Sequence, residues 1–222
     1  MSASIQIQAA YPEAPLVHME SLYYAEYDAD VVRRVSLASV LRDGHEPPSE
    51  SCMLPCGSGP CGLAFCAGMA DVVVACYGSH ELRALSSGKV LHRVPFANDL
   101  CADDRSGGVF VTSSAASAAS DAPGDPFDPN APATGAVYHL SPCGRELIAL
   151  TPPCIRYANG VAYDPARDRL FVSEHLRNRV LVYDIQPVPN KTGHCTVDQQ
   201  VNPCTRTCRR RRRRRSERPA PS

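Results

Sequence analysis

The apolar residues of this chain gather in short runs that recur in pairs. Each run is about five residues long, is rich in β-branched and aromatic side chains, and ends at turn-forming residues, which is typical of β-strands rather than helices. We therefore predict four strand pairs, three of them closed by a short polar turn. The pairs are Ser21–Glu26 with Val31–Val35, Asp71–Cys76 with Glu81–Leu85, Gly108–Thr112 with Gly135–Leu140, and Arg169–Glu174 with Arg179–Asp184.

A further apolar run precedes each of the last three pairs. With Gly62, Asp99 and Gly160 as markers in these runs, the spacings are 37 and 61 residues. The second spacing falls to 39 when the 22 residues at 113–134, rich in Ala, Ser, Asp and Pro, are treated as an inserted loop. A repeat near 40 residues with three or four strands per unit is typical of β-propeller blades. The runs are Gly62–Phe65, Asn98–Cys101 and Asn159–Ala162.

The repeat predicts an all-β fold, a partial β-propeller of about four blades, of which the first and last are incomplete. The expected organisation is a flexible N-terminus at 1–12, a propeller region at 13–185 with an inserted loop at 113–134, and a disordered Arg-rich tail at 186–222. A closed propeller usually has more than four blades, so the sequence resembles the front part of a longer one. An open ring exposes sheet edges and apolar surface, which also predicts self-association.

The formal net charge of zero hides an uneven distribution. Nine of the 23 basic residues lie in the last 17 positions, including Arg209–Arg215, which leaves 14 basic and 22 acidic residues at 1–205. The acidic body is therefore not expected to bind nucleic acid. The arginine run could bind nucleic acid, an anionic membrane or a nuclear import receptor, or it could be a gene-model artefact such as a translated intron.

No stretch of 18 apolar residues is present, and the N-terminus has neither a basic start nor an apolar core. The sequence thus predicts no transmembrane helix and no secretory signal. The expected location is the cytoplasm, or the nucleus if the arginine run is genuine.

The eleven cysteines are expected to be reduced thiols in these compartments. The spacing of Cys52, Cys56, Cys61 and Cys66 leaves structural zinc and disulfides as alternatives, although paired C-x2-C knuckles are missing.

Three oxygen-bearing side chains stand at, or just ahead of, the first strand of a predicted blade. They are Glu13, Asn98 and Asn159. The inner ends of such strands converge on the central channel of a propeller, so these side chains would form an all-oxygen site suited to Ca²⁺, Mg²⁺ or Mn²⁺. The alternative is that the two asparagines are turn residues, since Asn-Asp and Asn-Gly favour turns, and that Glu13 is a solvated carboxylate.

Three motifs in order resemble those of a known family. They are Glu13-Ala-Pro-Leu16, Phe96-Ala-Asn-Asp-Leu100 and Tyr157-Ala-Asn-Gly-Val161, the last followed by an Asp-Pro turn and Arg169-Leu-Phe-Val-Ser-Glu174. Over Glu13–Ile185 the chain resembles the SMP-30/gluconolactonase/LRE-like family, six-bladed propellers that hydrolyse lactones with one divalent metal. The resemblance implies a metal-dependent lactonase, a carboxylic ester hydrolase whose partner is a small-molecule lactone and whose cofactor is Ca²⁺, Mg²⁺ or Mn²⁺.

The resemblance also assigns roles to single residues. Glu13 and Asn159 match the family's metal ligands, and Asn98 matches the asparagine that faces metal and substrate. Phe96 stands where some relatives have an arginine that holds a sugar-acid lactone, which favours a less polar substrate. The family's fourth ligand and general base is an aspartate in a Pro-Asp-Gly-like motif, and no such motif follows Asp184. The catalytic residue is therefore unassigned, and the resemblance leaves open whether a chain without the last blades is active.

A second hypothesis is a non-catalytic propeller binding module whose basic tail binds nucleic acid or other anionic partners.

Two other sequence motifs give no support to a different function. Gly57–Gly62 fits G-x-G-x-x-G, but no strand precedes it and Pro60 interrupts it, so it is a chance match. A G-x-S-x-G sequence is absent, which leaves an α/β-type serine hydrolase without support.

Overall fold

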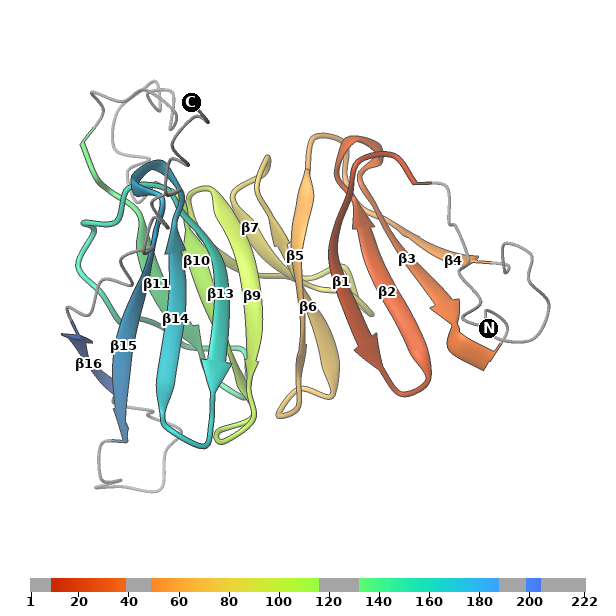
Figure 1. Cartoon of the computed structure of the whole chain (residues 1–222). Coiled ribbons are helices and arrows are strands. Elements are labelled where there is room, and N and C mark those ends of the chain that lie inside the picture. Colours follow the sequence, from red (N-terminus) through yellow and green to blue (C-terminus); the bar gives the residue numbers. More distant parts are fainter. Residues whose placement is uncertain (1–8, 39–48, 116–131, 188–198, 205–222) are drawn as a thin grey trace, which may run out of the picture.

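The strands of this chain form four separate antiparallel sheets (Figure 1). The computed structural model describes residues 9–38, 49–115, 132–187 and 199–204, with side chains as far as Ile185. In each sheet four strands lie side by side in chain order, which is the construction of a propeller blade. We number these sheets as blades 1 to 4 along the chain.

Blade 1 contains β1 (Pro12–His18), β2 (Ser21–Glu26), β3 (Val31–Ser36) and β4 (Ser49–Met53). Blade 2 contains β5 (Pro60–Cys66), β6 (Asp71–Cys76), β7 (Glu81–Ala84) and β8 (Val90–Arg93). Blade 3 contains β9 (Ala97–Asp103), β10 (Gly108–Ser113), β11 (Ala136–Leu140) and β12 (Leu147–Ala149). Blade 4 contains β13 (Ala158–Asp164), β14 (Arg169–Glu174), β15 (Arg179–Pro187) and β16 (Gln199–Cys204). The short 3-10 helices η1 (Tyr27–Ala29) and η2 (His175–Arg177) join the second and third strands of blades 1 and 4.

The blades pack face to face, and their first strands lie innermost. Strand β5 contacts both β1 and β9, and β9 contacts β13. A separate apolar core fills each junction between successive blades, with Val32 and Leu63 in the first core, Val73 and Val111 in the second, and Phe110 in the third. A middle blade therefore buries both faces, which explains why β6 and β10 read as almost continuous apolar runs. The predicted all-β fold and partial four-blade propeller are confirmed.

The outer strands were not predicted. Strands β4, β8 and β12 are short and contain exposed or half-exposed residues, so they lack the apolar pattern that identified the others. Strand β16 lies inside the segment predicted to be a disordered tail, and it completes blade 4 by pairing with β15. Its Pro203 is tolerated because an edge strand leaves one row of backbone N–H groups unpaired. Blades 1 and 4, predicted to be incomplete, each have four strands.

Several predicted segments lie outside the described residues. They are most of the flexible N-terminus (1–8), most of the inserted loop (116–131) and the arginine run (within 205–222). None of the helices in the described ranges has the length and apolarity needed to cross a membrane.

Candidate active site

Each inner strand begins in the same unusual way. The residue shortly ahead of it has a left-handed backbone, and soon afterwards the pairing with the second strand of the blade shifts by one residue. Such a β-bulge bends a strand and redirects its side chains. The left-handed residues are Tyr11 (φ 52°), Gly59 (φ 54°), Phe96 (φ 47°) and Tyr157 (φ 56°).

Two positions after each left-handed residue, one side chain reaches a common cavity at the propeller axis. These four axial side chains are Glu13, Cys61, Asn98 and Asn159, and they line a cavity of about 450 Å³. An adjoining cavity of about 360 Å³ is lined by the same four side chains and by Asp99. Three of the four predicted site residues, from three different blades, therefore lie around one site.

Phe96, the fourth predicted site residue, lines neither of these cavities. Its ring packs against Tyr77, with ring centroids 5.3 Å apart, and against the edge of His80 at 4.4 Å. Its backbone N–H donates to His80 Nδ1 at 2.9 Å, and burial lowers the pKa of His80, which favours the neutral ring that can accept this bond. Tyr77 does line the larger cavity, so Phe96 supports the site from behind Tyr77.

Cys61 occupies the axial position of blade 2 and was not predicted there. Its thiol donates to the carbonyl oxygen of Asn98 at 2.9 Å. Burial, with smaller contributions from Cys76 and the carboxylates of Asp99 and Glu13, raises the pKa of this thiol well above its ordinary value. Cys61 is therefore a protonated thiol and not a soft metal ligand. The signal that could have found it is its place two residues after Gly59.

The spacing of the cysteines does not correspond to a zinc cluster in the structure. Within the described residues, no group of three or more His, Cys, Asp and Glu side chains is placed to hold a metal ion. Cys66, for example, donates to the carbonyl oxygen of Gly107 in blade 3. The eight cysteines whose side chains the structure describes are free thiols.

The side chain of Asn98 is oriented by a neighbouring hydroxyl. Asn98 Nδ2 donates to Ser114 Oγ at 3.0 Å, and Ser114 Oγ donates to the carbonyl oxygen of Ala158 at 3.0 Å. Because the amide nitrogen is used in this bond, the amide oxygen is the atom left to face a cation or a substrate. Asn98 and Asn159 lie within strands β9 and β13, and not in turns as the alternative interpretation proposed.

Blade 3 also fixes the backbone on either side of Asn159. The Thr112 hydroxyl donates to the carbonyl oxygen of Asn159 at 2.5 Å and accepts from the N–H of Asp99 at 3.0 Å. The Asp99 carboxylate accepts from the N–H of Val161 at 2.9 Å. Burial raises the pKa of Asp99, although the hydrogen bonds that its carboxylate accepts from the N–H groups of Val161 and Leu100 oppose the shift. The bulge that presents Asn159 is thus held by fully or largely buried polar groups of the preceding blade.

Thr112→Val is expected to loosen this bulge, because valine has the same shape but leaves two partly buried backbone groups without this partner. We expect a loss of about 2 kcal/mol in the free energy of unfolding and about tenfold weaker binding of Ca²⁺ at the axial cavity. Thr151→Val is the matched control, since the Thr151 hydroxyl also accepts a buried backbone N–H, that of Val137 at 3.0 Å, but Val137 lines neither cavity. Calorimetric titration with Ca²⁺ checks the result, and equal affinity in the two variants would contradict it.

The axial side chains fit a hard divalent cation by the chemistry of their donors. Glu13 supplies a carboxylate, and Asn98 and Asn159 supply amide oxygens, which are ligands that Ca²⁺, Mg²⁺ and Mn²⁺ prefer. Burial raises the pKa of Glu13, and a nearby cation would favour its charged form. One carboxylate with two amides is a weakly charged set of donors.

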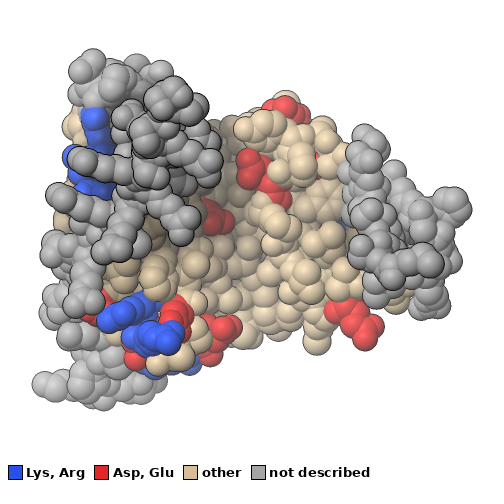
Figure 2. Space-filling model, viewed as in Figure 1, with Lys and Arg blue, Asp and Glu red and all other residues tan. Residues whose placement is uncertain are grey.

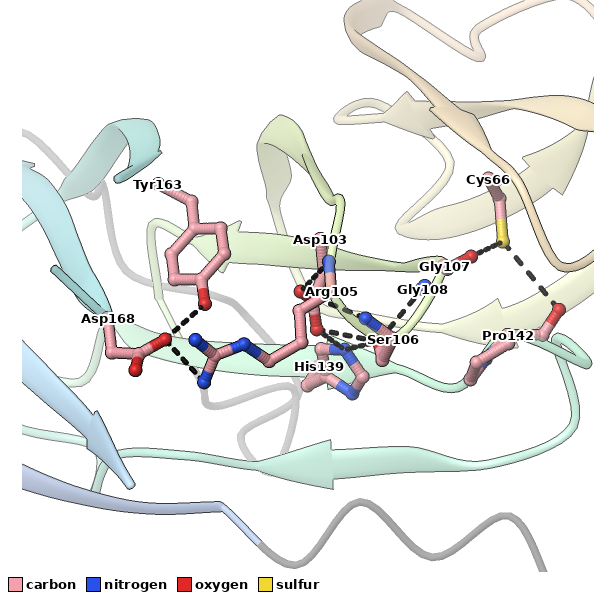
Figure 3. A network of polar contacts seen from close by, with 10 residues as sticks. All are labelled: Cys66, Asp103, Arg105, Ser106, Gly107, Gly108, His139, Pro142, Tyr163 and Asp168. Atoms are coloured by element: carbon pink, nitrogen blue, oxygen red, sulfur yellow. Dashed lines mark hydrogen bonds and ion pairs between the residues drawn. The ribbon is translucent and has the colours of Figure 1, made fainter. Parts of the chain in front are cut away.

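A second polar cluster lies at the far end of the inner strands and resembles a catalytic triad (Figure 3). Ser106 Oγ donates to Asp103 Oδ2 at 2.6 Å, and His139 Nε2 contacts both that oxygen at 3.1 Å and Ser106 Oγ at 3.3 Å. Since the serine proton is directed to Asp103, His139 Nε2 carries a proton and donates. A triad needs the carboxylate on Nδ1 and a basic Nε2 facing the serine. This cluster is therefore structural, and we give it no catalytic role.

The contacts around this cluster join three blades (Figure 3). Arg105, in the turn after β9, forms an ion pair with Asp168 of blade 4 at 2.6 Å, and the Tyr163 hydroxyl donates to the same carboxylate at 2.9 Å. On the other side, the Cys66 thiol of blade 2 donates to the carbonyl oxygen of Gly107 at 3.2 Å. The network holds the inner strands at the end opposite to the axial cavities.

Four blades around a polar axial cavity define a β-propeller with a site for a small molecule or ion. The family model described as SMP-30/Gluconolactonase/LRE-like region matches residues 11–202, and the chain belongs to this family. The predicted family is thus confirmed. No curated protein matches the sequence.

Solved structures with the same fold include three enzymes or binding proteins. A gluconolactonase from Xanthomonas campestris is 21% identical, with a TM-score of 0.58, and the match covers 81% of this chain and 60% of that one. A luciferin-regenerating enzyme is 16% identical, with a TM-score of 0.58, and covers 88% and 60%. The calcium-binding protein regucalcin from Agrobacterium tumefaciens is 16% identical, with a TM-score of 0.54, and covers 88% and 60%. At these identities the likeness shows the fold alone, and this chain spans 60% of the length of each.

Proposed function

We propose that the chain carries the cation-dependent site of a lactone hydrolase, a carboxylic ester hydrolase. The observation that supports this proposal is that Glu13, Asn98 and Asn159, from three blades, line one axial cavity. Membership of the family adds support, as do the gluconolactonase and the calcium-binding regucalcin among proteins of like fold. The alternative of a basic binding module rests on the arginine run at 209–215, which lies outside the described residues.

The proposed roles follow from the oxygen donors of these three side chains. Glu13 and Asn159 would hold the cation, and Asn98 would face both cation and substrate through its amide oxygen. A bound divalent cation supplies Lewis acidity toward the lactone carbonyl and toward water. The Tyr77 and Tyr157 phenols at the cavity would limit the access of bulk water and contact the body of the substrate.

No general base is assigned among the described residues. Asp99 lies at the adjoining cavity, but its two carboxylate oxygens accept from the N–H groups of Leu100 and Val161 at 2.8 and 2.9 Å. A carboxylate engaged in this way orients backbone and is poorly placed to accept a proton from water. Since the chain spans 60% of its structural relatives, the activity of the whole protein belongs to this proposal as well.

The decisive experiment uses the full chain, stripped of metal with a chelator and then supplied with Ca²⁺, Mg²⁺ or Mn²⁺. Lactone opening is followed as acid release with dihydrocoumarin and glucono-lactone as substrates, and a rate above that of the spontaneous reaction is expected only with a divalent cation. The cation is also expected to stabilise the fold by about 2.7 kcal/mol at a concentration 100 times its dissociation constant. The proposal would be contradicted if the protein catalyses the hydrolysis of none of the lactones tested at cation concentrations that raise its melting temperature.

A further inference from the structure

The mouth of the larger axial cavity is built from phenol rings. Tyr11, Tyr27, Tyr77 and Tyr157 line it together with His175. Among the described residues that line it, Glu13 and Asp28 carry carboxylates, and none is a Lys or Arg. Figure 2 shows Asp and Glu side chains over the middle of the molecular face and at its lower left and lower right, whereas the Lys and Arg side chains lie mainly on its left side.

The rings support one another and are held in place before any ligand binds. Tyr11 and Tyr27 lie with their ring centroids 5.8 Å apart and inclined by 60°. The Tyr157 hydroxyl donates to the Tyr77 hydroxyl at 3.4 Å, and the Tyr77 ring packs on Phe96 behind it. Phenols are neutral at neutral pH. Neutral rings fixed in this way offer flat apolar surface and hydroxyl groups, and no positive charge.

We infer that the cavity selects an uncharged lactone with an aromatic or flat apolar body, and rejects phosphorylated or carboxylated sugar lactones. This inference rests on the proposed function and names its substrate class. An anionic substrate is normally held by Arg or Lys, and the described part of the lining contains neither. A divalent cation at Glu13 would bring two positive charges, and the two carboxylates of the lining balance them. The volume of about 450 Å³ falls within the range of small-molecule pockets and suits a bicyclic ring.

Binding and hydrolysis can be tested separately with the full chain. Calorimetry with the cation present uses three probes that resist hydrolysis: hydrocarbostyril (the lactam of dihydrocoumarin), gluconolactam and phosphogluconate. The aryl lactam should bind at least about tenfold more tightly than gluconolactam, because two or more ring contacts contribute to its binding. Phosphogluconate is expected to show no binding. Tighter binding of phosphogluconate or gluconolactam than of the aryl lactam would overturn the inference.

Variants of Tyr77 separate ring contact from folding. Tyr77→Leu is expected to weaken binding of the aryl lactam about tenfold, whereas Tyr77→Phe, which keeps the ring, is expected to stay within about twofold of the unsubstituted chain. Tyr138→Leu is the control, because Tyr138 is half-buried against the core between blades 2 and 3. Equal loss in Tyr77→Leu and Tyr138→Leu would contradict the inference. If the aryl lactam binds as expected but no lactone is hydrolysed, the hydrolase proposal fails while the ligand class stands.

Discussion

Glutamine in place of Glu13 is expected to weaken Ca²⁺ binding at the axial cavity about 100-fold and to lower cation-dependent lactone opening at least as much. The substitution keeps the shape of the side chain and removes its charge. Glu13 supplies the only carboxylate among the four axial side chains, since its companions are a protonated thiol and two amides. A cation held by so few charges depends strongly on each of them. Calorimetric titration with Ca²⁺ and initial rates of acid release measure the two effects.

Glu50→Gln is the matched control for this substitution. Glu50 lies on β4 of the same blade, and its ion pair with Arg34 joins side chains that are 78% and 49% exposed, so its loss is expected to change stability and affinity little. Both variants are expected to fold, because Glu13 makes no hydrogen bond that shapes the blade among those described. If the Glu13→Gln chain binds Ca²⁺ as tightly as the Glu50→Gln chain, Glu13 is not a ligand of the cation.

The blades could be predicted because both faces of a propeller sheet are buried. The second and third strands of each blade read as apolar runs, and the first strands of blades 2 to 4 recur at a constant distance ahead of them. Asn98 and Asn159 were found for the same reason, since each stands at the start of such a run. The outer strands escaped prediction because their exposed faces impose no pattern, as the half-polar sequence of Ser49–Met53 shows.

The contacts within the site could not be predicted because they depend on how one blade sits against the next. Thr112 and Asn159 are 47 residues apart, and only the packing of blade 3 on blade 4 brings them together. Cys61 was considered only as a member of a cysteine cluster, since its axial place follows from the left-handed backbone at Gly59 and the bulge after it. Phe96 was assigned by resemblance, whereas the fold turns its ring toward Tyr77.

Asp103→Asn is expected to lower the free energy of unfolding by about 2 kcal/mol at neutral pH, because it removes a buried carboxylate that accepts two side-chain hydrogen bonds. Asp103 and His139 are fully buried, and the Asp103 carboxylate accepts from His139 Nε2 and from the Ser106 hydroxyl. Burial alone would raise the pKa of Asp103, but the hydrogen bonds from His139 and Ser106 outweigh it and hold this pKa at about 2. Urea denaturation at several pH values measures the effect.

The sign of the pH dependence follows from that lowered pKa. An aspartate whose pKa falls from 3.8 to about 2 on folding contributes about 2 kcal/mol that is fully present above pH 4. This contribution is lost as the pH falls through 4 toward 2, so the difference between the parent chain and Asp103→Asn should shrink over that interval. Asp104→Asn, at the exposed neighbouring position, should follow the parent chain throughout. A constant difference between pH 7 and pH 2 would show that Asp103 stabilises the blades by packing rather than by its charge.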